Sequence, residues 1–304
     1  MLEVAVIGLR WLQYSGAVVL LGAPLFLLCS FRGGDGPNLI WTRPTLAVAA
    51  TVVALGSLAA LVAQTAVMAG SLSEALKPAS LSFTITGMAL GMAMVARAVV
   101  AGLTLVAIVA LKPGRPLWTV LATAGVIVSA SFAWTGHGAG TEGPGALLHV
   151  TAAMVHAVSA ALWLGALAAL TMLLLRRTAP DDPAIHRALR GFAGLGTLAV
   201  VLLVLSGLGN SWFMIGPAQA AGLGASLYGQ LLIAKLALFV LMLALAAGNR
   251  FRLTPVLGAV LAGGGDPGQA LRRLRLNIML ETLVGAALLA VVAVMGTLAP
   301  PSAM

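Results

Sequence analysis

The sequence TGHGAGTEGPGALLHVTAAMVHAVSAALWLGAL, residues Thr135 to Leu167, decides how this chain folds. It begins as a short glycine-rich loop and continues into an apolar segment, with no charged residue between Glu142 and Arg176. The segment exceeds the roughly 20 residues that cross a bilayer as a helix, so it predicts a transmembrane helix. Three of the four histidines also lie in this stretch. Such side chains are costly inside a membrane unless something holds them, which makes them candidates for a functional site.

The composition of the whole chain places it in a membrane. Of its 304 residues, 61% are hydrophobic and 8% are charged, and the mean hydropathy is +1.06. A water-soluble domain cannot bury so large an apolar fraction, whereas a bilayer can surround it. The net charge of +9 comes from basic residues scattered through short loops, which is typical of a polytopic membrane protein and does not indicate nucleic-acid binding. The single cysteine, Cys29, excludes an internal disulfide.

Apolar runs long enough to cross the hydrocarbon recur along the chain, separated by charged or glycine- and proline-rich breaks. We predict eight transmembrane helices, at about residues 4–29, 45–70, 81–111, 117–136, 146–175, 190–214, 226–248 and 276–298. A helix satisfies its own backbone hydrogen bonds in lipid, so segments of this length indicate an all-α, polytopic helical bundle and not a barrel. The longest polar connection is itself half apolar, so we expect one integral membrane domain over residues 1–304.

Lysine and arginine in the loops predict the orientation of the bundle. Most of the 17 basic residues lie in the first, third, fifth and seventh loops, whereas the even-numbered loops contain only Lys77. Since loops rich in lysine and arginine stay in the cytoplasm, both termini are predicted to be periplasmic. The basic residues of the odd-numbered loops are Arg32, Arg43, Lys112, Arg115, Arg176, Arg177, Arg187, Arg190, Arg250, Arg252, Arg272, Arg273 and Arg275.

With this orientation the three histidines of the opening stretch belong to the periplasmic half. His137 lies in the fourth loop, His149 lies about one turn into the fifth helix, and His156 lies deeper. Seven helical residues put His149 and His156 on one face, roughly 10 Å apart along the axis. Ligands of one ion favour spacings of three or four residues on a helix, so these imidazoles resemble two stations on a path more than one chelate. His137 could close on His149 at the mouth, although a solvated His137 and a His149 bonded to a neighbouring carbonyl are the alternatives.

Methionines form a second candidate set of metal ligands. Met88 and Met92 are four residues apart, hence on one face, in the outer half of the third predicted helix. Met68, Met214 and Met295 lie near the outer ends of the second, sixth and eighth helices. Thioether and imidazole together form a soft donor set that suits Cu(I), and imidazole also suits Cu(II). A methionine taken singly is more often a packing residue, so the set matters because it gathers on the side of the histidines.

Three charged residues lie deep inside predicted helices. Arg97 is near the middle of the third helix, Lys235 is in the outer half of the seventh, and Glu281 is in the inner half of the eighth. Such residues usually face the interior of a bundle and pair with each other. Two interpretations are open, a structural ion pair and a role in gating or proton coupling to transport. The fourth histidine, His186, lies in the basic fifth loop and is expected at the surface.

Six segments occur in an order that is found in a known family. They are RWLQYSGAVVLLGAPLF (10–26), TGHG (135–138), HVTAAMVHAVSAALWLGAL (149–167), RGFAGLGTLAVVLLVLSG (190–207), YGQLLIAKLALFVLMLALAAGNR (228–250) and LRLNIMLETLVGAALLAVVAVMG (274–296). By these segments, which include Trp163–Leu164–Gly165, the chain resembles the copper resistance protein D (CopD) family of bacterial inner-membrane proteins. The family pattern often has a second glycine where this chain has Ala166.

The resemblance implies a copper-handling protein of the bacterial inner membrane that moves copper from periplasm to cytoplasm. It further implies a periplasmic copper-binding partner of the CopC type. Copper follows from the resemblance alone, whereas the residues predict an outward-facing site lined by imidazole and thioether inside a helical bundle. The candidate metal ligands are His137, His149, His156, Met88 and Met92.

Two other classes of function compete with copper transport. A b-type cytochrome needs two imidazoles on opposite sides of a haem, normally from different helices. Of the three histidines in the opening stretch, only His137 lies off the fifth helix. A metal-independent assembly factor or a channel for another solute is the second rival. An enzyme is not expected, because the sequence has no nucleophile–base motif, phosphate-binding glycine loop or paired carboxylates.

Overall fold

The computed structural model describes residues 2–31, 39–176, 182–216 and 220–303 of the chain. In these ranges the protein is helical, without strands, and eight helices are long and apolar enough to cross a membrane. The predicted fold class, an all-α membrane bundle, is therefore confirmed. The long helices are α1 (Leu2–Ser30), α2 (Thr42–Ala69), α5 (Ala89–Ala110), α6 (Arg115–Ala130), α7 (Ala146–Leu175), α8 (Asp182–Met214), α10 (Leu227–Gly248) and α12 (Gly268–Met295).

Short elements connect or extend these helices. Between α2 and α5 lie α3 (Leu72–Ala75) and α4 (Pro78–Gly87), and after α6 come the 3-10 turns η1 (Ser131–Thr135) and η2 (His137–Gly140). The turn η4 (Ala220–Ala225) precedes α10, and the turn η6 (Pro301–Ala303) follows α12. A π-helical turn, η5 (Asn249–Leu253), joins α10 to α11 (Thr254–Ala262).

Two of the predicted helices differ from the structure in ways that matter for function. The predicted helix 81–111 is wrong as one continuous helix, because Met88 is extended (φ −129°, ψ 131°) and separates α4 from α5. The seventh helix does not end at Gly248, because the π-helical turn carries it on into α11. The fifth helix, α7, is a single α-helix over the predicted range.

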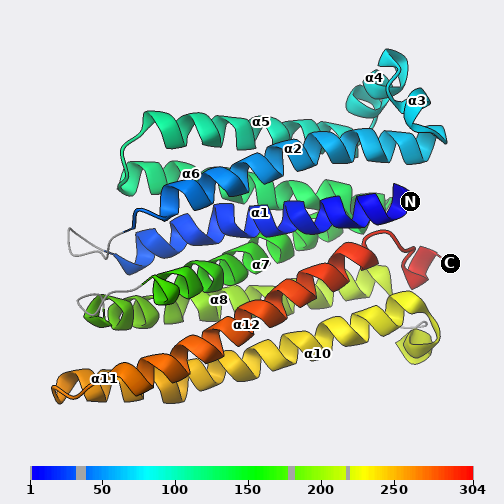
Figure 1. The fold of residues 1–304 in the computed structure, drawn as a ribbon. Helices are drawn as coiled ribbons and strands as arrows, with labels where there is room; N and C mark the ends of the chain where they lie inside the picture. Colours follow the sequence, from blue (N-terminus) through cyan, green and yellow to red (C-terminus); the bar gives the residue numbers. More distant parts are fainter. Residues whose placement is uncertain (1, 32–38, 177–181, 217–219, 304) are drawn as a thin grey trace.

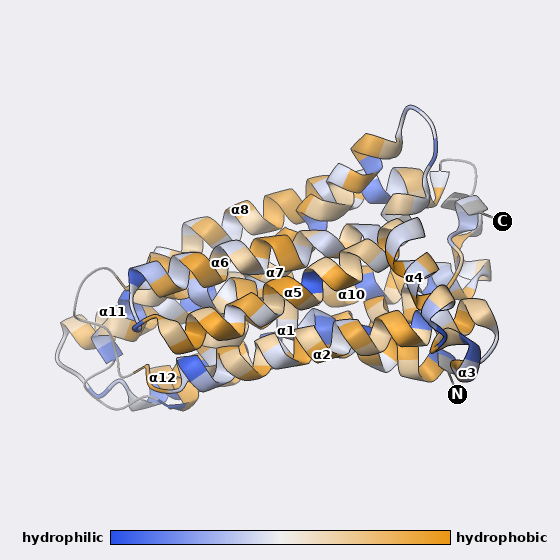
Figure 2. Ribbon diagram, turned by 90° about the horizontal axis from the view of Figure 1, so that it is seen from above, coloured by the Kyte–Doolittle hydropathy of each residue, from blue (hydrophilic) through white to orange (hydrophobic). Residues whose placement is uncertain are grey.

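The helices lie side by side along their length, so the bundle has two ends (Figure 1). Both termini, α3, α4 and the connection from α8 to α10 lie at one end, which we call the termini end. The C-terminal ends of α1, α5 and α7 lie at the other end with α11, and we call it the basic end. Figure 2 shows hydrophobic residues along the middle of the helices and hydrophilic residues gathered mainly at the ends. Which end faces the cytoplasm stays a prediction from the loop charges.

Two helices, α1 and α7, form the centre of the bundle and cross at glycines. Helix α1 packs against α2, α6 and α7, and α7 also packs against α8 and α12. A Cβ atom placed on Gly165 of α7 would overlap Val18 O and Gly22 Cα of α1. A Cβ atom on Gly125 of α6 would lie 2.6 Å from Leu21 Cα of α1. Small residues let helices approach closely in a membrane, and here they fix the distance between α1 and its neighbours.

Candidate functional site

Two adjoining cavities lie among the helices at the termini end. The larger encloses about 210 Å³ and is lined from α1, η1, α7, α8, α10 and α12, and the smaller encloses about 130 Å³. The two cavities share several lining residues, so they form one continuous cavity with a few polar side chains in a mainly apolar wall, which we call the termini-end cavity. The shared residues are His156, Asn210, Met214, Lys235 and Val292. His149 and Tyr14 line the larger cavity, and Met295 and Tyr228 line the smaller.

His149 is held at the first turn of α7. Its side chain is 2% exposed, and its ring stacks on Phe213 of α8 with 4.7 Å between the ring centroids. Its Nδ1 atom hydrogen-bonds with Thr141 Oγ1 at 2.6 Å, across the turn that precedes the helix. Gly145, just before α7, leaves room for the Phe213 ring, because a Cβ there would lie 2.7 Å from it. The imidazole therefore has a fixed orientation at the wall of the cavity.

His156 lies two turns deeper and has a different partner on α8. Its Nδ1 atom is 3.1 Å from Ser206 Oγ. The hydroxyl of Ser206 donates to the carbonyl of Leu202, so it accepts a hydrogen bond from the Nδ1–H of His156. A neutral imidazole protonated at Nδ1 has its lone pair on Nε2. Ser206 thus fixes the tautomer in which Nε2 of His156 can bind a metal ion.

The two histidines are spaced as the sequence predicts. No break interrupts α7 between them, so their Cα atoms are roughly 10 Å apart along the helix. Two ring nitrogens that share one ion are each about 2 Å from it, and therefore within about 4 Å of each other. Since each ring is also tied to its own partner, Thr141 or Ser206, the arrangement favours two separate positions along one cavity.

The loop that contains His137 folds back against α7. Residues 137–140 form η2, which packs on α7, and a Cβ on Gly138 would lie 2.9 Å from Ala153 Cβ. Gly138 also lines the larger cavity. The side chain of His137 lies outside the described part of the chain, so its role as a ligand stays a prediction. The backbone nevertheless brings residue 137 next to the helix of the other two histidines.

Met88 and Met92 lie away from this cavity. Met88 precedes the first residue of α5, so the two methionines do not share a helix face as predicted. Met92 is 52% exposed on the outer surface of the bundle, and neither residue lines the cavity. Met68, on α2, is likewise 44% exposed. Of the five methionines considered, the structure places Met214 and Met295 at the cavity wall.

Sequence reasoning missed the polar stripe on α8. Ser206, Asn210 and Met214 are spaced by four residues, which places them on one face of the helix. Asn210 Oδ1 is buried and forms no hydrogen bond among the described residues, and Met214 Sδ accepts from Tyr228 Oη at 3.7 Å. A serine and an asparagine four residues apart in a run of leucine and valine were the available signal, because polar residues in such a run face the bundle interior.

Arg97 organises the polar core beside the cavity. Its side chain is 1% exposed and donates hydrogen bonds to Gln13 Oε1 (2.8 Å), Ser131 Oγ (2.9 Å) and Thr135 Oγ1 (3.3 Å). The guanidinium also lies 3.7 Å above the ring of Phe132. Three of these four partners belong to η1, which ends one residue before the Gly136–His137 pair. Arg97 therefore fixes the turn from which the histidine loop departs.

Of the two interpretations of the intramembrane charges, the structure does not support an ion pair among the described residues. Among the described residues the only ion pair joins Lys77 to Glu74, at 2.6 Å. Arg97 is satisfied by neutral groups, Lys235 lines the termini-end cavity, and Glu281 accepts a hydrogen bond from Asn249 near the basic end, at 2.8 Å. Each charge has a separate environment because the three residues lie on α5, α10 and α12, at different depths.

The described residues contain no group of three or more histidine, cysteine, aspartate or glutamate side chains that could hold a metal ion. A closed structural site normally has four such ligands. The donors at the termini-end cavity are instead two spaced imidazoles, the thioether of Met214 and the amide oxygen of Asn210. Such a set of donors suits transient binding of an ion better than its storage.

Comparisons with known proteins identify what this chain is similar to. Residues 1–147 match the family described as "Copper resistance protein D-like, N-terminal domain", and residues 186–295 match "Copper resistance protein D". The chain is 34% identical to Copper resistance protein D of Pseudomonas syringae pv. tomato, over 97% of this chain and 96% of that protein. It is 28% identical to Copper transport protein CutJ of Bacillus subtilis, over 78% of this chain and 44% of that protein.

The chain is also 29% identical to Inner membrane protein YebZ of Escherichia coli, over 55% of this chain and 55% of that protein. No solved structure matches.

Proposed function

Because this chain belongs to the copper resistance protein D family and is a multi-pass inner-membrane protein with a copper-related function, we propose that it moves copper ions from the periplasm into the cytoplasm. In this proposal the termini-end cavity is the periplasmic entrance. The observation that carries it is the pair of separately anchored imidazoles, His149 and His156, along one cavity wall. Its periplasmic position follows from the basic residues at the opposite end.

Copper would enter at His149 and move to His156. The first position combines His149 with His137, which η2 brings to the same end of α7. The second combines Nε2 of His156 with the thioether of Met214, a soft donor pair that suits Cu(I), while imidazole also accepts Cu(II). That Met88 and Met92 are additional ligands stays a prediction. Neither residue lines the cavity, so the two positions are useful for comparison.

Lys235 and Asn210 would tune the second position. Lys235 lines both parts of the cavity with His156, and a positive charge there weakens the binding of a metal cation. Conduction requires sites that are strong enough to be entered and weak enough to be left. Asn210 Oδ1 offers a neutral oxygen ligand between the two arms of the cavity. Glu281, farther along the bundle, is the candidate for proton coupling of transport.

A periplasmic copper-binding protein of the CopC type would deliver copper to the entrance. The delivered ion would pass from that partner to the loop between α6 and α7, which ends at the first imidazole. Membrane lipid surrounds the remaining surface. In this proposal the protein acts as a transporter and not as an enzyme.

Copper uptake by cells tests the proposal. We expect cells that express the protein to accumulate copper, and cells that express the His149→Ala, His156→Ala double variant at equal membrane level to accumulate no more than cells without it. The Thr151→Ala variant is the control, because Thr151 lies on the same helix, is exposed and does not line the cavity. Copper accumulation by the double variant at the level of the unmodified protein would refute the proposal. A strong haem absorption band in the purified protein would instead favour an electron carrier.

Reporter fusions test the orientation on which the direction depends. A reporter fused after Met304 should be active only in the periplasm, and one inserted near Asp182 only in the cytoplasm. The reverse pattern would place the two histidines on the cytoplasmic side and reverse the proposed entrance.

A further inference from the structure

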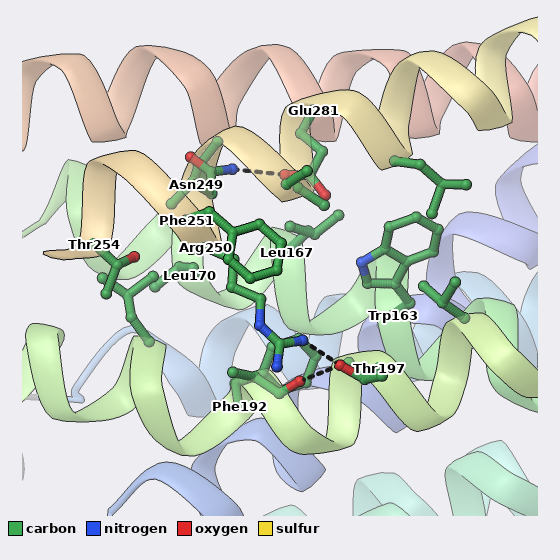
Figure 3. Close-up of a pocket in the computed structure, with 18 of the residues that line it drawn as sticks. Trp163, Leu167, Leu170, Phe192, Thr197, Asn249, Arg250, Phe251, Thr254 and Glu281 are labelled. Atoms are coloured by element: carbon green, nitrogen blue, oxygen red, sulfur yellow. Dashed lines mark hydrogen bonds between the residues drawn. The ribbon is translucent and has the colours of Figure 1, made fainter.

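A second cavity lies toward the basic end, between α8 on one side and α10 with η5 on the other (Figure 3). It encloses about 350 Å³ and is lined mainly by apolar side chains, with Trp163, Leu167 and Leu170 of α7 at its back. Residues 163–170 span about 10 Å of α7, which is within the depth of one leaflet of about 15 Å. We call it the lateral groove.

The lateral groove opens toward the surrounding bilayer. Val201 of α8 and Phe251 of η5 line it, and these side chains are 47% and 71% exposed. Helix α8 packs on α7 and α11, and α10 packs on α12, so α8 and α10 form the two sides of the groove. An apolar cavity that opens sideways between transmembrane helices is accessible to a lipid tail.

A basic depression continues the groove toward the end of the bundle. It measures about 790 Å³ and shares Arg190, Arg250 and Thr254 with the groove. Arg187 and His186 complete its polar lining, and none of the described residues that line it is a carboxylate. The Arg250 guanidinium donates to Thr197 Oγ1 on α8, as Figure 3 shows. Three guanidinium groups thus lie where the apolar groove meets the basic depression.

Within the described residues, Arg187, Arg190 and Arg250 form no ion pair. In the described part of the chain the only ion pair is the one between Lys77 and Glu74, at the termini end. Glu281, at the wall of the apolar groove, is engaged by Asn249. Guanidinium groups form strong paired hydrogen bonds with phosphate oxygens, and basic clusters at the cytoplasmic surface attract anionic lipids.

From this juxtaposition we propose that the lateral groove and the basic depression together bind one anionic phospholipid. One acyl chain occupies the apolar groove between α8 and α10, and the phosphate is bound by Arg187, Arg190 and Arg250. The inference is independent of the copper path, because it uses other residues at the other end of the bundle. The bound lipid would contact both the N-terminal part of α8 and η5 at the basic end.

Native mass spectrometry of the full chain in detergent tests the proposal, with phosphatidylglycerol as the probe. We expect one phosphatidylglycerol to be retained where phosphatidylcholine of the same chain length is not. The Arg187→Gln, Arg190→Gln, Arg250→Gln variant should need at least about tenfold more phosphatidylglycerol for half occupancy, since it lacks the positive charges that attract the anionic headgroup. The Arg272→Gln, Arg273→Gln variant is the matched control, because these exposed arginines lie on α12 outside the depression.

A second variant tests the acyl chain separately. Ala247, on α10, lines the groove and is exposed, so Ala247→Trp should fill the groove without disturbing the core. We expect it to lower phosphatidylglycerol retention although all arginines are intact. Equal retention of phosphatidylcholine, full competition by soluble glycerol phosphate, or unchanged retention in the Ala247→Trp variant would each overturn the proposal. The copper-site variant His149→Ala, His156→Ala should retain the phospholipid normally, so failure of one inference is separable from failure of the other.

Discussion

The two ends of this bundle are built from the same helices but have opposite chemistry. At the termini end, α7, α8, α10 and α12 enclose imidazole, thioether and amide groups that suit a soft metal cation. Toward the basic end the same four helices line an apolar groove with arginines at its mouth. The difference teaches that the helix frame alone does not determine function. Function depends on a few polar side chains and on their depth in the bundle.

The largest effect is expected from a change that disrupts the helix packing on which both ends depend. A Cβ on Gly165 overlaps the backbone of α1, so we expect Gly165→Ala to destabilise the fold by about 3 kcal/mol or more and to abolish both copper handling and phospholipid retention. Gly102→Ala on α5 is the control, because a Cβ there has nothing within 4 Å. Thermal unfolding in detergent measures the stability of the two variants. A Gly165→Ala protein as stable as the Gly102→Ala protein would contradict the close crossing of α1 and α7.

A sharper variant affects only the termini end. Ser206 orients His156 through Nδ1, and loss of such a partner of a metal-binding histidine typically lowers metal affinity about 10- to 100-fold. We expect Ser206→Ala to reduce copper affinity to that extent while phosphatidylglycerol retention stays unchanged. Competition titration with a copper chelator measures the affinity. The Ser159→Ala change is the control, because Ser159 is also a buried serine but does not line the cavity. Equal copper affinities in the two variants would remove Ser206 from the account.

Lys235 gives a smaller effect of opposite sign. Replacing it with methionine removes a positive charge beside His156, so copper should bind more tightly. We expect Lys235→Met to increase retained copper about tenfold, which corresponds to roughly 1.4 kcal/mol, and to slow uptake. Metal analysis of the purified protein together with uptake rates provides the check. Tighter binding without slower uptake would show that release from His156 does not limit transport.

The smallest expected effect separates the two groups of methionines. Met214→Leu removes a thioether from the cavity wall at nearly constant volume, so folding should change by less than about 1.5 kcal/mol. We expect it to weaken Cu(I) handling a few-fold, within about 1 kcal/mol. The Met88→Leu, Met92→Leu double variant, which changes residues outside the cavity, should not weaken it. A loss confined to the double variant would restore the sequence prediction and remove Met214 from the path.

The helical bundle could be predicted from the sequence because transmembrane helices are recognised by the length and hydropathy of their segments. The fifth helix matches the predicted range, since its apolar run has clear polar limits. The break at Met88 was not predictable, because no proline or charge interrupts the run there, and the extended backbone depends on how α4 packs against α5. The continuation beyond Gly248 was missed because η5 contains the two arginines, Arg250 and Arg252, that looked like a loop.

The candidate site could be predicted only along a single helix. The spacing of His149 and His156 followed from the helical repeat, whereas their partners Thr141 and Ser206 depend on tertiary packing. The choice between the two interpretations of the buried charges also depended on tertiary packing. Arg97 found Gln13 and the residues of η1, which are distant in sequence and neutral.

The most direct test of the central claim compares copper uptake over a range of copper concentrations for His149→Ala, His156→Ala and the double variant, at matched expression. Two separate stations predict that His149→Ala raises the copper concentration for half-maximal uptake, because only capture is impaired. His156→Ala should instead lower the maximal rate even at saturating copper, because an ion at the entrance lacks its next ligand. The double variant should show both defects. Superimposable curves for all three variants would mean one shared chelate and would contradict the account.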